Sequence, residues 1–177
     1  MKKILIASAG GSAAYNYIES IRNNPANEEF YLVGANASPY HLELANVDKR
    51  YILPKCDQPG YIEALNKIIN IENIDFLHCQ SDVEVIFLAK NRDQIKTNIF
   101  LPNSEIIEIC QNKMKFNAKL AEYKIEVPEA YYLTCEHDME KAFSILIKKN
   151  EKIWLRAIRG AGYKAALPVK NVEHAKM

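Results

Sequence analysis

The sequence predicts an α/β protein built on a parallel sheet, because strands and helices alternate along about the first hundred residues. The strands are apolar throughout instead of alternately apolar and polar, which is typical of strands buried on both faces. After Pro102 this alternation gives way to helices, a short strand and a hairpin. We therefore expect one domain over residues 1–102 and the beginning of a second over residues 103–177.

Five apolar runs of strand length make up the predicted sheet. They cover residues 2–8, 28–36, 49–54, 74–79 and 98–102. Gly10 and Gly11 end the first strand, and Ser12 is a suitable cap for the helix that follows. Further helices are predicted at residues 41–47, 61–70 and 82–95, the last of them capped by Ser81 or Asp82.

The second part of the chain has a different order of elements. Residues 104–125 predict helices with a break near residues 111–113, residues 126–134 a turn and a strand, and residues 139–150 a helix with a basic end. Residues 153–169 predict a hairpin, and residues 172–177 the first turns of another helix.

Bulk composition limits the classes of function. The 177 residues are 49% hydrophobic and 25% charged with a net charge of +1, so we expect neither nucleic acid nor an anionic membrane as a partner. No apolar stretch reaches the length of a membrane span. The four cysteines lie far apart without a CxxC pair, which argues against structural zinc and favours a cytoplasmic protein in which Cys79 and Cys110 are buried.

The histidines indicate no metal site either. His41, His137 and His174 have no acidic or cysteine partner at ligand spacing, and His78 lies in an apolar strand, where a hydrogen-bonded core histidine is expected. The sequence also has no G-x-S-x-G motif and no visible Ser/His/Asp arrangement. We therefore predict no catalytic residue and no metal ligand in this chain.

Polar residues follow the predicted strands at the edge where ligands of parallel sheets bind. Gly10, Gly11 and Ser12 follow the first strand, and Asp82 and Glu84 follow the fourth. These five residues are candidate substrate contacts. Asp82 has an alternative role as a helix N-cap, and the glycines have one as a purely structural turn.

The glycine turn also raises the question of NAD. The sequence there is A-G-G-S-A-A instead of G-x-G-x-x-G, and the second strand ends at Asn36 where an NAD-binding fold prefers an acid. A non-catalytic nucleotide- or NAD-binding module therefore stands as the alternative function. An interaction domain that only presents a surface ranks last, because no long apolar patch supports it.

The hairpin and one lysine suggest a phosphate site. Arg156 ends the first strand of the hairpin, and Gly160 and Gly162 lie in its turn, where glycine allows backbone N–H groups to face an anion. Lys113 opens a predicted helix, an unfavourable place for a cation unless it meets an anion there. The alternatives are an ordinary hairpin and a solvated lysine.

Three features in this order resemble the first half of an ATP-grasp ligase. They are the α/β domain, then N-K-M-K-F-N-A-K-L-A-E-Y-K-I-E-V-P at residues 112–128, and then I-W-L-R-A-I-R-G-A-G-Y-K-A-A at residues 153–166. The similarity is to the branch with the carbamoyl-phosphate synthase large subunit and biotin carboxylase. It implies a Rossmann-like pre-ATP-grasp domain followed by part of an α+β ATP-grasp small domain. Asn112 stands where the family usually has Asp, and arginine at position 156 favours the carbamoyl-phosphate synthase type.

The resemblance also implies ligands and roles. Lys113 and Arg156 would hold the phosphates of ATP, and Arg159, Gly160 and Gly162 would belong to the phosphate flap. The intact parent would use ATP and Mg²⁺ to convert a small carboxylate into an acyl phosphate. The family's metal ligands lie downstream of the flap and beyond this sequence, so we expect the piece to be inactive alone. An unpaired edge strand after about residue 150 makes a homo-oligomer or local disorder a further expectation.

Overall fold

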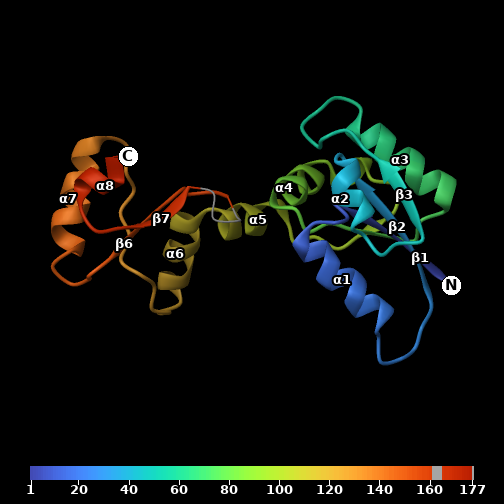
Figure 1. The fold of residues 1–177 in the computed structure, drawn as a ribbon, viewed down its shortest axis with the longest axis horizontal. Helices are drawn as coiled ribbons and strands as arrows, with labels where there is room; N and C mark the ends of the chain where they lie inside the picture. The colour runs from blue at the N-terminus through green and yellow to red at the C-terminus, as the bar shows by residue number, and fades with distance from the viewer. Residues whose placement is uncertain (161–164, 177) are drawn as a thin grey trace. The chain divides into compact units, whose positions relative to one another are not determined.

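The computed structural model describes residues 1–160 and 165–176, and the chain divides into two compact units, Met1–Ser104 and Glu105–Met177 (Figure 1). The first unit is an α/β domain with a parallel five-stranded sheet, as the sequence predicts. None of the described helices combines the length and apolar character that a membrane span requires.

The first unit alternates strands and helices along the chain. Its elements are β1 (Lys2–Ala7), α1 (Ser12–Arg22), β2 (Phe30–Asn36), α2 (Pro39–Glu43), β3 (Lys49–Ile52), α3 (Tyr61–Glu72), β4 (Phe76–His78), α4 (Asp82–Lys90), the 3₁₀ turn η1 (Arg92–Gln94) and β5 (Asn98–Ile99). The strand order is β3-β2-β1-β4-β5, so the chain reverses its direction across the sheet between β3 and β4. This is the order of a doubly wound sheet.

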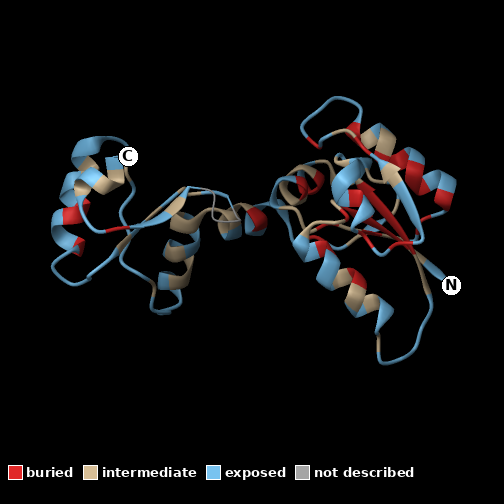
Figure 2. Ribbon diagram, in the orientation of Figure 1, coloured by how far each residue is buried: buried red, intermediate tan, exposed pale blue. Residues whose placement is uncertain are grey.

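Both faces of the sheet are buried, which explains the continuous apolar strands. On one face Ile4 and Ile6 of β1 and Leu32 of β2 pack in one cluster with residues of α1 and α2. The next residues along the strands, Leu5 and Val33, point to the opposite face and are also fully buried. α1 and α3 lie on opposite sides of the sheet, and the buried residues concentrate in the central strands (Figures 1 and 2).

The turn between β1 and α1 needs glycine for a structural reason. Gly10 has φ +89°, and a Cβ there would lie 1.7 Å from the carbonyl oxygen of His41. The contact is with backbone at the start of α2, so it cannot be relieved by a side-chain movement. Gly11 has ordinary φ and occupies the N-cap of α1, so the prediction that Ser12 caps this helix was wrong. Ser12 is instead the first residue of α1.

The second unit contains helices and one hairpin. Its elements are α5 (Ser104–Gln111), which begins at the last residue of the first unit, α6 (Lys113–Glu122), α7 (Glu136–Leu146), β6 (Ile153–Arg156), β7 (Ala166–Val169) and α8 (Val172–Lys176). β6 and β7 are antiparallel, with Arg156 opposite Ala166 and Trp154 opposite Pro168. The predicted hairpin and the predicted break between α5 and α6 are therefore confirmed.

The strand predicted at residues 126–134 is wrong. This described stretch has no regular secondary structure and is mostly exposed. Pro128 has no N–H to contribute to a ladder, and the strand pairing in the described part of the second unit is that of β6 with β7. Thr134, expected in the strand, instead donates from its N–H and its hydroxyl to Asp138 in the first turn of α7.

Two further expectations about side chains need correction. Cys110 is exposed, although an apolar helical run predicted burial. His78 does lie against the core, but its Nε2 is buried without a hydrogen-bond partner among the described residues. Its ring stacks on Tyr17 of α1 with 3.4 Å between the ring centroids. Burial lowers the pKa of His78 to about 4.

We predict that the first unit loses stability through His78 as the pH falls. The folded-state pKa of about 4 lies below the ordinary histidine pKa of 6.5, so the stability contribution is complete above pH 6.5 and is lost between pH 6.5 and 4. The loss should approach about 2 kcal/mol for this half-buried group. His78→Phe keeps the stack and removes the titration. Calorimetric unfolding of both proteins from pH 7 to 4 should show them diverging, and parallel curves would contradict the assignment.

We also predict that Gly10→Ala destabilises the first unit more than Gly60→Ala. Gly60 has a similar φ of +85°, but a Cβ there meets nothing within 4 Å. The matched pair therefore separates backbone strain, about 1–2 kcal/mol, from the added collision with His41. We expect a further loss of about 1–3 kcal/mol for Gly10→Ala in urea unfolding. Equal losses at the two positions would show that the collision is relieved at little cost.

Candidate functional site

The carboxyl edge of the sheet is organised around the buried carboxylate of Glu84. Its Oε2 accepts a hydrogen bond of 2.6 Å from the Ser8 hydroxyl, and its Oε1 accepts one of 2.9 Å from Tyr61. The Cys79 thiol lies 3.7 Å from Oε2. One carboxylate therefore links the end of β1, the start of α3 and the first turn of α4.

The donors around Glu84 stay protonated. Burial raises the pKa of the Tyr61 hydroxyl and of the Cys79 thiol, and the nearby Glu84 charge raises both further. Neither group is therefore a nucleophile near neutral pH. Glu84 is itself only 8% exposed. Its oxygens serve the scaffold here, and its predicted substrate contact stays a prediction.

The other predicted residues of this edge are more exposed. Ser12 and Asp82 both lie on the surface, each as the first residue of its helix. Ser81, one of the two predicted caps, takes the N-cap position of α4 without a side-chain cap bond, and the N-cap role of Asp82 was wrong. Asp82 instead lies in the first turn, where a carboxylate suits the helix dipole. The hydrogen bond from Ser8 to Glu84 thus joins the turn after β1 to the first turn of α4.

Asn36 occupies the place where a dinucleotide-binding fold uses an acid. Its Nδ2 donates to the Ala9 carbonyl at 2.6 Å, and its Oδ1 accepts from the Ser38 N–H at 2.9 Å. The side chain therefore braces the glycine turn against the end of β2. Both of its polar atoms are occupied by backbone of the first unit.

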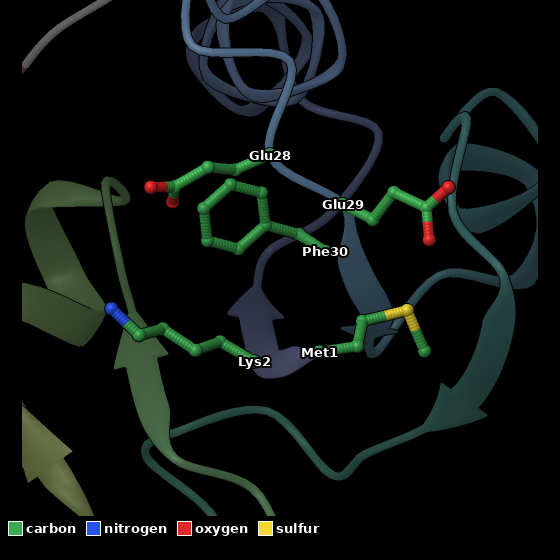
Figure 3. A pocket seen from close by; sticks show the side chains of 5 residues that line it. All are labelled: Met1, Lys2, Glu28, Glu29 and Phe30. Atoms are coloured by element: carbon green, nitrogen blue, oxygen red, sulfur yellow. The ribbon is translucent and has the colours of Figure 1, made fainter.

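A surface hollow of the first unit lies at the opposite edge of the sheet. It is lined by Met1, Lys2, Glu28, Glu29 and Phe30, at the amino ends of β1 and β2 (Figure 3). Ligands of doubly wound sheets bind at the carboxyl ends of the strands. We assign no function to this hollow.

In the second unit Lys113 lies against the hairpin turn. Asn112 caps α6, because its Oδ1 accepts the N–H groups of Met114 and Lys115 at 3.1 Å each. The Lys113 N–H then donates to the Ile158 carbonyl at 3.1 Å. Its ammonium donates to the carbonyls of Ile158 at 3.4 Å and Gly160 at 3.2 Å. The start of α6 is thus tied to the start of the turn.

The structure describes three of the other residues predicted for the phosphate site: Arg156, Arg159 and Gly160. Arg156 is exposed at the end of β6, and Gly160 has φ +115°, a left-handed conformation that favours glycine. Gly162 lies outside the described residues. The loop is closed by a hydrogen bond of 2.7 Å from Ala157 to Ala165. Lys113, Arg159 and Gly160 therefore come together around one turn.

Arg159 has a partner that sequence reasoning missed. Its guanidinium pairs with Oε1 of Glu108 in α5, and the same oxygen accepts from the Lys115 ammonium at 3.0 Å. These two hydrogen bonds, that from Lys115 first, lower the pKa of Glu108. No local pattern marks Glu108, because Arg159 is 51 residues away and Lys115 lies beyond a helix break. Within residues 1–160 and 165–176, no three His, Cys, Asp or Glu side chains are grouped to hold a metal ion.

Solved structures share this fold along nearly the whole chain. An N5-carboxyaminoimidazole ribonucleotide synthetase from Thermotoga maritima matches at TM-score 0.61 and 20% identity, over 99% of this chain and 43% of that one. An L-amino acid ligase from Bacillus licheniformis matches at 0.67 and 13%, over 99% and 41%. The biotin carboxylase domain of the Hydrogenobacter thermophilus 2-oxoglutarate carboxylase matches at 0.60 and 17%, over 98% and 38%. The chain thus spans less than half the length of each of these proteins.

These likenesses confirm the fold that the resemblance implied, which is that of the N-terminal portion of ATP-grasp ligases. A comparison with curated protein sequences gives no match. The family described as "PylC-like, N-terminal domain" matches residues 4–100, which is more than half of the chain. The chain therefore belongs to the PylC-like family.

Proposed function

We propose that this chain is the N-terminal part of an ATP-dependent ligase that activates a carboxylate as an acyl phosphate. Residues 1–102 would be the pre-ATP-grasp domain, and residues 103–177 the beginning of the ATP-grasp domain. The observation that carries the proposal is the position of Lys113, whose ammonium lies on the Ile158 and Gly160 carbonyls beside Arg159. Cations around a glycine-containing turn suit the phosphates of a nucleotide.

The proposed reaction has two steps. A carboxylate oxygen attacks the γ-phosphorus of ATP, the bond to the β–γ bridging oxygen breaks, and ADP leaves. A nucleophile then attacks the acyl carbon, and inorganic phosphate leaves. Lys113, Arg156 and Arg159 would hold the phosphates and offset the charge that develops during transfer. Mg²⁺ in the intact enzyme would supply further positive charge to the phosphates.

Solved structures of the same fold support this class of substrate. One relative was solved with MgADP, ADP and bicarbonate, and a carboxyaminoimidazole ribonucleotide synthase from Aspergillus clavatus with ATP. Another is an L-amino acid ligase. Nucleotide and a small carboxylate are therefore the ligands we propose, with a cytoplasmic site of action and assembly into a homo-oligomer as further expectations. At the sheet edge of the first unit, Gly10, Gly11, Ser12, Asp82 and Glu84 remain candidate substrate contacts.

The finer proposal is a carbamoyl-phosphate synthase-like ligase that phosphorylates bicarbonate. It rests on arginine at position 156, the type of cation that this branch favours at the end of the strand. A fixed guanidinium fork engages two phosphate oxygens at once, whereas an ammonium is a single point charge.

We predict that the intact enzyme scrambles isotope in ATP labelled with ¹⁸O at the β–γ bridge. Reversible acyl phosphate formation frees the β-phosphate to rotate, so the label moves into a non-bridging position. Phosphorus NMR of ATP recovered with bicarbonate, and separately with a panel of L-amino acids, measures the exchange. Scrambling with bicarbonate alone supports the carbamoyl-phosphate synthase type. Scrambling only with an amino acid supports the broader ligase proposal, and none with any carboxylate contradicts both.

We further predict that Arg156→Ala weakens ATP binding to the intact enzyme roughly tenfold or more, the effect of losing a charge-assisted pair with phosphate. Lys148→Ala is the matched control, because Lys148 is an exposed cation of the same unit outside the turn. Isothermal titration with ATP measures both, and circular dichroism checks that each variant is folded. Unchanged affinity in Arg156→Ala would remove this residue from the phosphate site.

A further inference from the structure

Glu108 is a carboxylate that contacts two cations, Arg159 of the predicted flap and Lys115 of α6. It lies in α5 and is 38% exposed, so solvent reaches it, as it does Arg159 at 42% and Lys115 at 54%. One negative charge therefore faces two positive charges, and the group of three keeps an excess of +1. Exposed ion pairs of this kind contribute little to folding, so the arrangement is readily exchanged.

The three residues come from three separate segments. Glu108 lies in α5, Lys115 in the first turn of α6, and Arg159 in the turn after β6. The Asn112 cap sets the direction of α6 and so the place of Lys115. Lys113 fixes Ile158 and Gly160 on either side of Arg159. Both cations are therefore presented to Glu108 by backbone that other contacts already hold.

A carboxylate between two cations occupies the place that suits a phosphate oxygen. Both groups accept charge-assisted hydrogen bonds from guanidinium and ammonium, and only one of them can hold the same donors at a time. We propose that Glu108 is a built-in competitor of the nucleotide polyphosphate: it holds Arg159 and Lys115 in the absence of nucleotide, and phosphate displaces it. The inference rests on the proposed function and adds Lys115 to the phosphate-binding residues.

The proposal predicts an unusual effect of mutation on ligand affinity. Removal of an ordinary structural ion pair leaves ligand affinity unchanged or weakens it, whereas removal of a competitor strengthens it. Glu108→Gln should therefore tighten binding of ATP, and of inorganic tripolyphosphate, about two- to fivefold to the intact enzyme. Glu105→Gln is the matched control, because Glu105 lies in the first turn of the same helix and its change alters net charge equally.

A double-mutant cycle assigns the effect to Arg159. Titration calorimetry compares Glu108→Gln, Arg159→Gln and the double variant with the parent. The gain from Glu108→Gln should shrink to the level of Glu105→Gln when Arg159 is already replaced. A gain that persists in full without Arg159, or a Glu108→Gln variant that binds no tighter than Glu105→Gln, overturns the proposal.

A second measurement does not depend on nucleotide binding. Amide exchange at residues 158–160 of the nucleotide-free protein should rise in Glu108→Gln and stay unchanged in Glu105→Gln, because the pair with Arg159 restrains the turn. If tripolyphosphate binds to none of the proteins, the proposed phosphate site itself fails, and this exchange experiment alone decides whether Glu108 holds the turn. Unchanged exchange in Glu108→Gln overturns the inference.

Discussion

Every strand of the first unit runs parallel to its neighbours, and this constraint decides where the other parts of the unit lie. A parallel pair needs a crossover, so each connection carries a helix back over one face of the sheet. Both faces are then covered, which requires the continuous apolar strands KKILIA and FYLVGAN. The carboxyl ends of β1 and β4 lie side by side in consequence, and the Ser8 hydroxyl after β1 donates a hydrogen bond to Glu84 of α4 there.

Glu84 shows how a buried polar group at that edge obtains its hydrogen bonds. A buried carboxylate is costly unless it accepts good hydrogen bonds, and Glu84 accepts them from Ser8 and Tyr61. Ser8 has φ +52°, a strained conformation for a residue with a side chain, so its hydroxyl bond holds a turn that would otherwise relax. Asn36 at the end of β2 donates to this turn at Ala9, and Gly10 allows the turn to pass close to the His41 carbonyl of α2. The turn after β1 is thus held by contacts within the first unit.

The elements that the sequence predicts well are those whose cause is local. The strands KKILIA and FYLVGAN are continuous apolar runs, and the break before Lys113 coincides with the Asn112 cap. The failures have causes elsewhere in the chain. Residues 126–134 have strand-like composition, but a strand needs a partner, and the strands of this unit pair with each other. Gly10 is visible as a turn residue, but its actual constraint is a carbonyl of His41 that no local pattern discloses.

The residues of the candidate phosphate site also differ in whether the sequence alone could identify them. Lys113, Arg156 and Gly160 are predicted from their order along the chain, whereas the contact of Glu108 with Arg159 is visible only in the folded structure. Its presence follows from electrostatics. Arg159 and Lys115 repel one another, and the Glu108 carboxylate that both contact reduces that repulsion. Under the proposed function, the same carboxylate lowers affinity for phosphate, because each donor it holds has to be released before phosphate binds. The proposed site would then combine weaker binding with an ordered empty state, a combination that favours release of the product nucleotide.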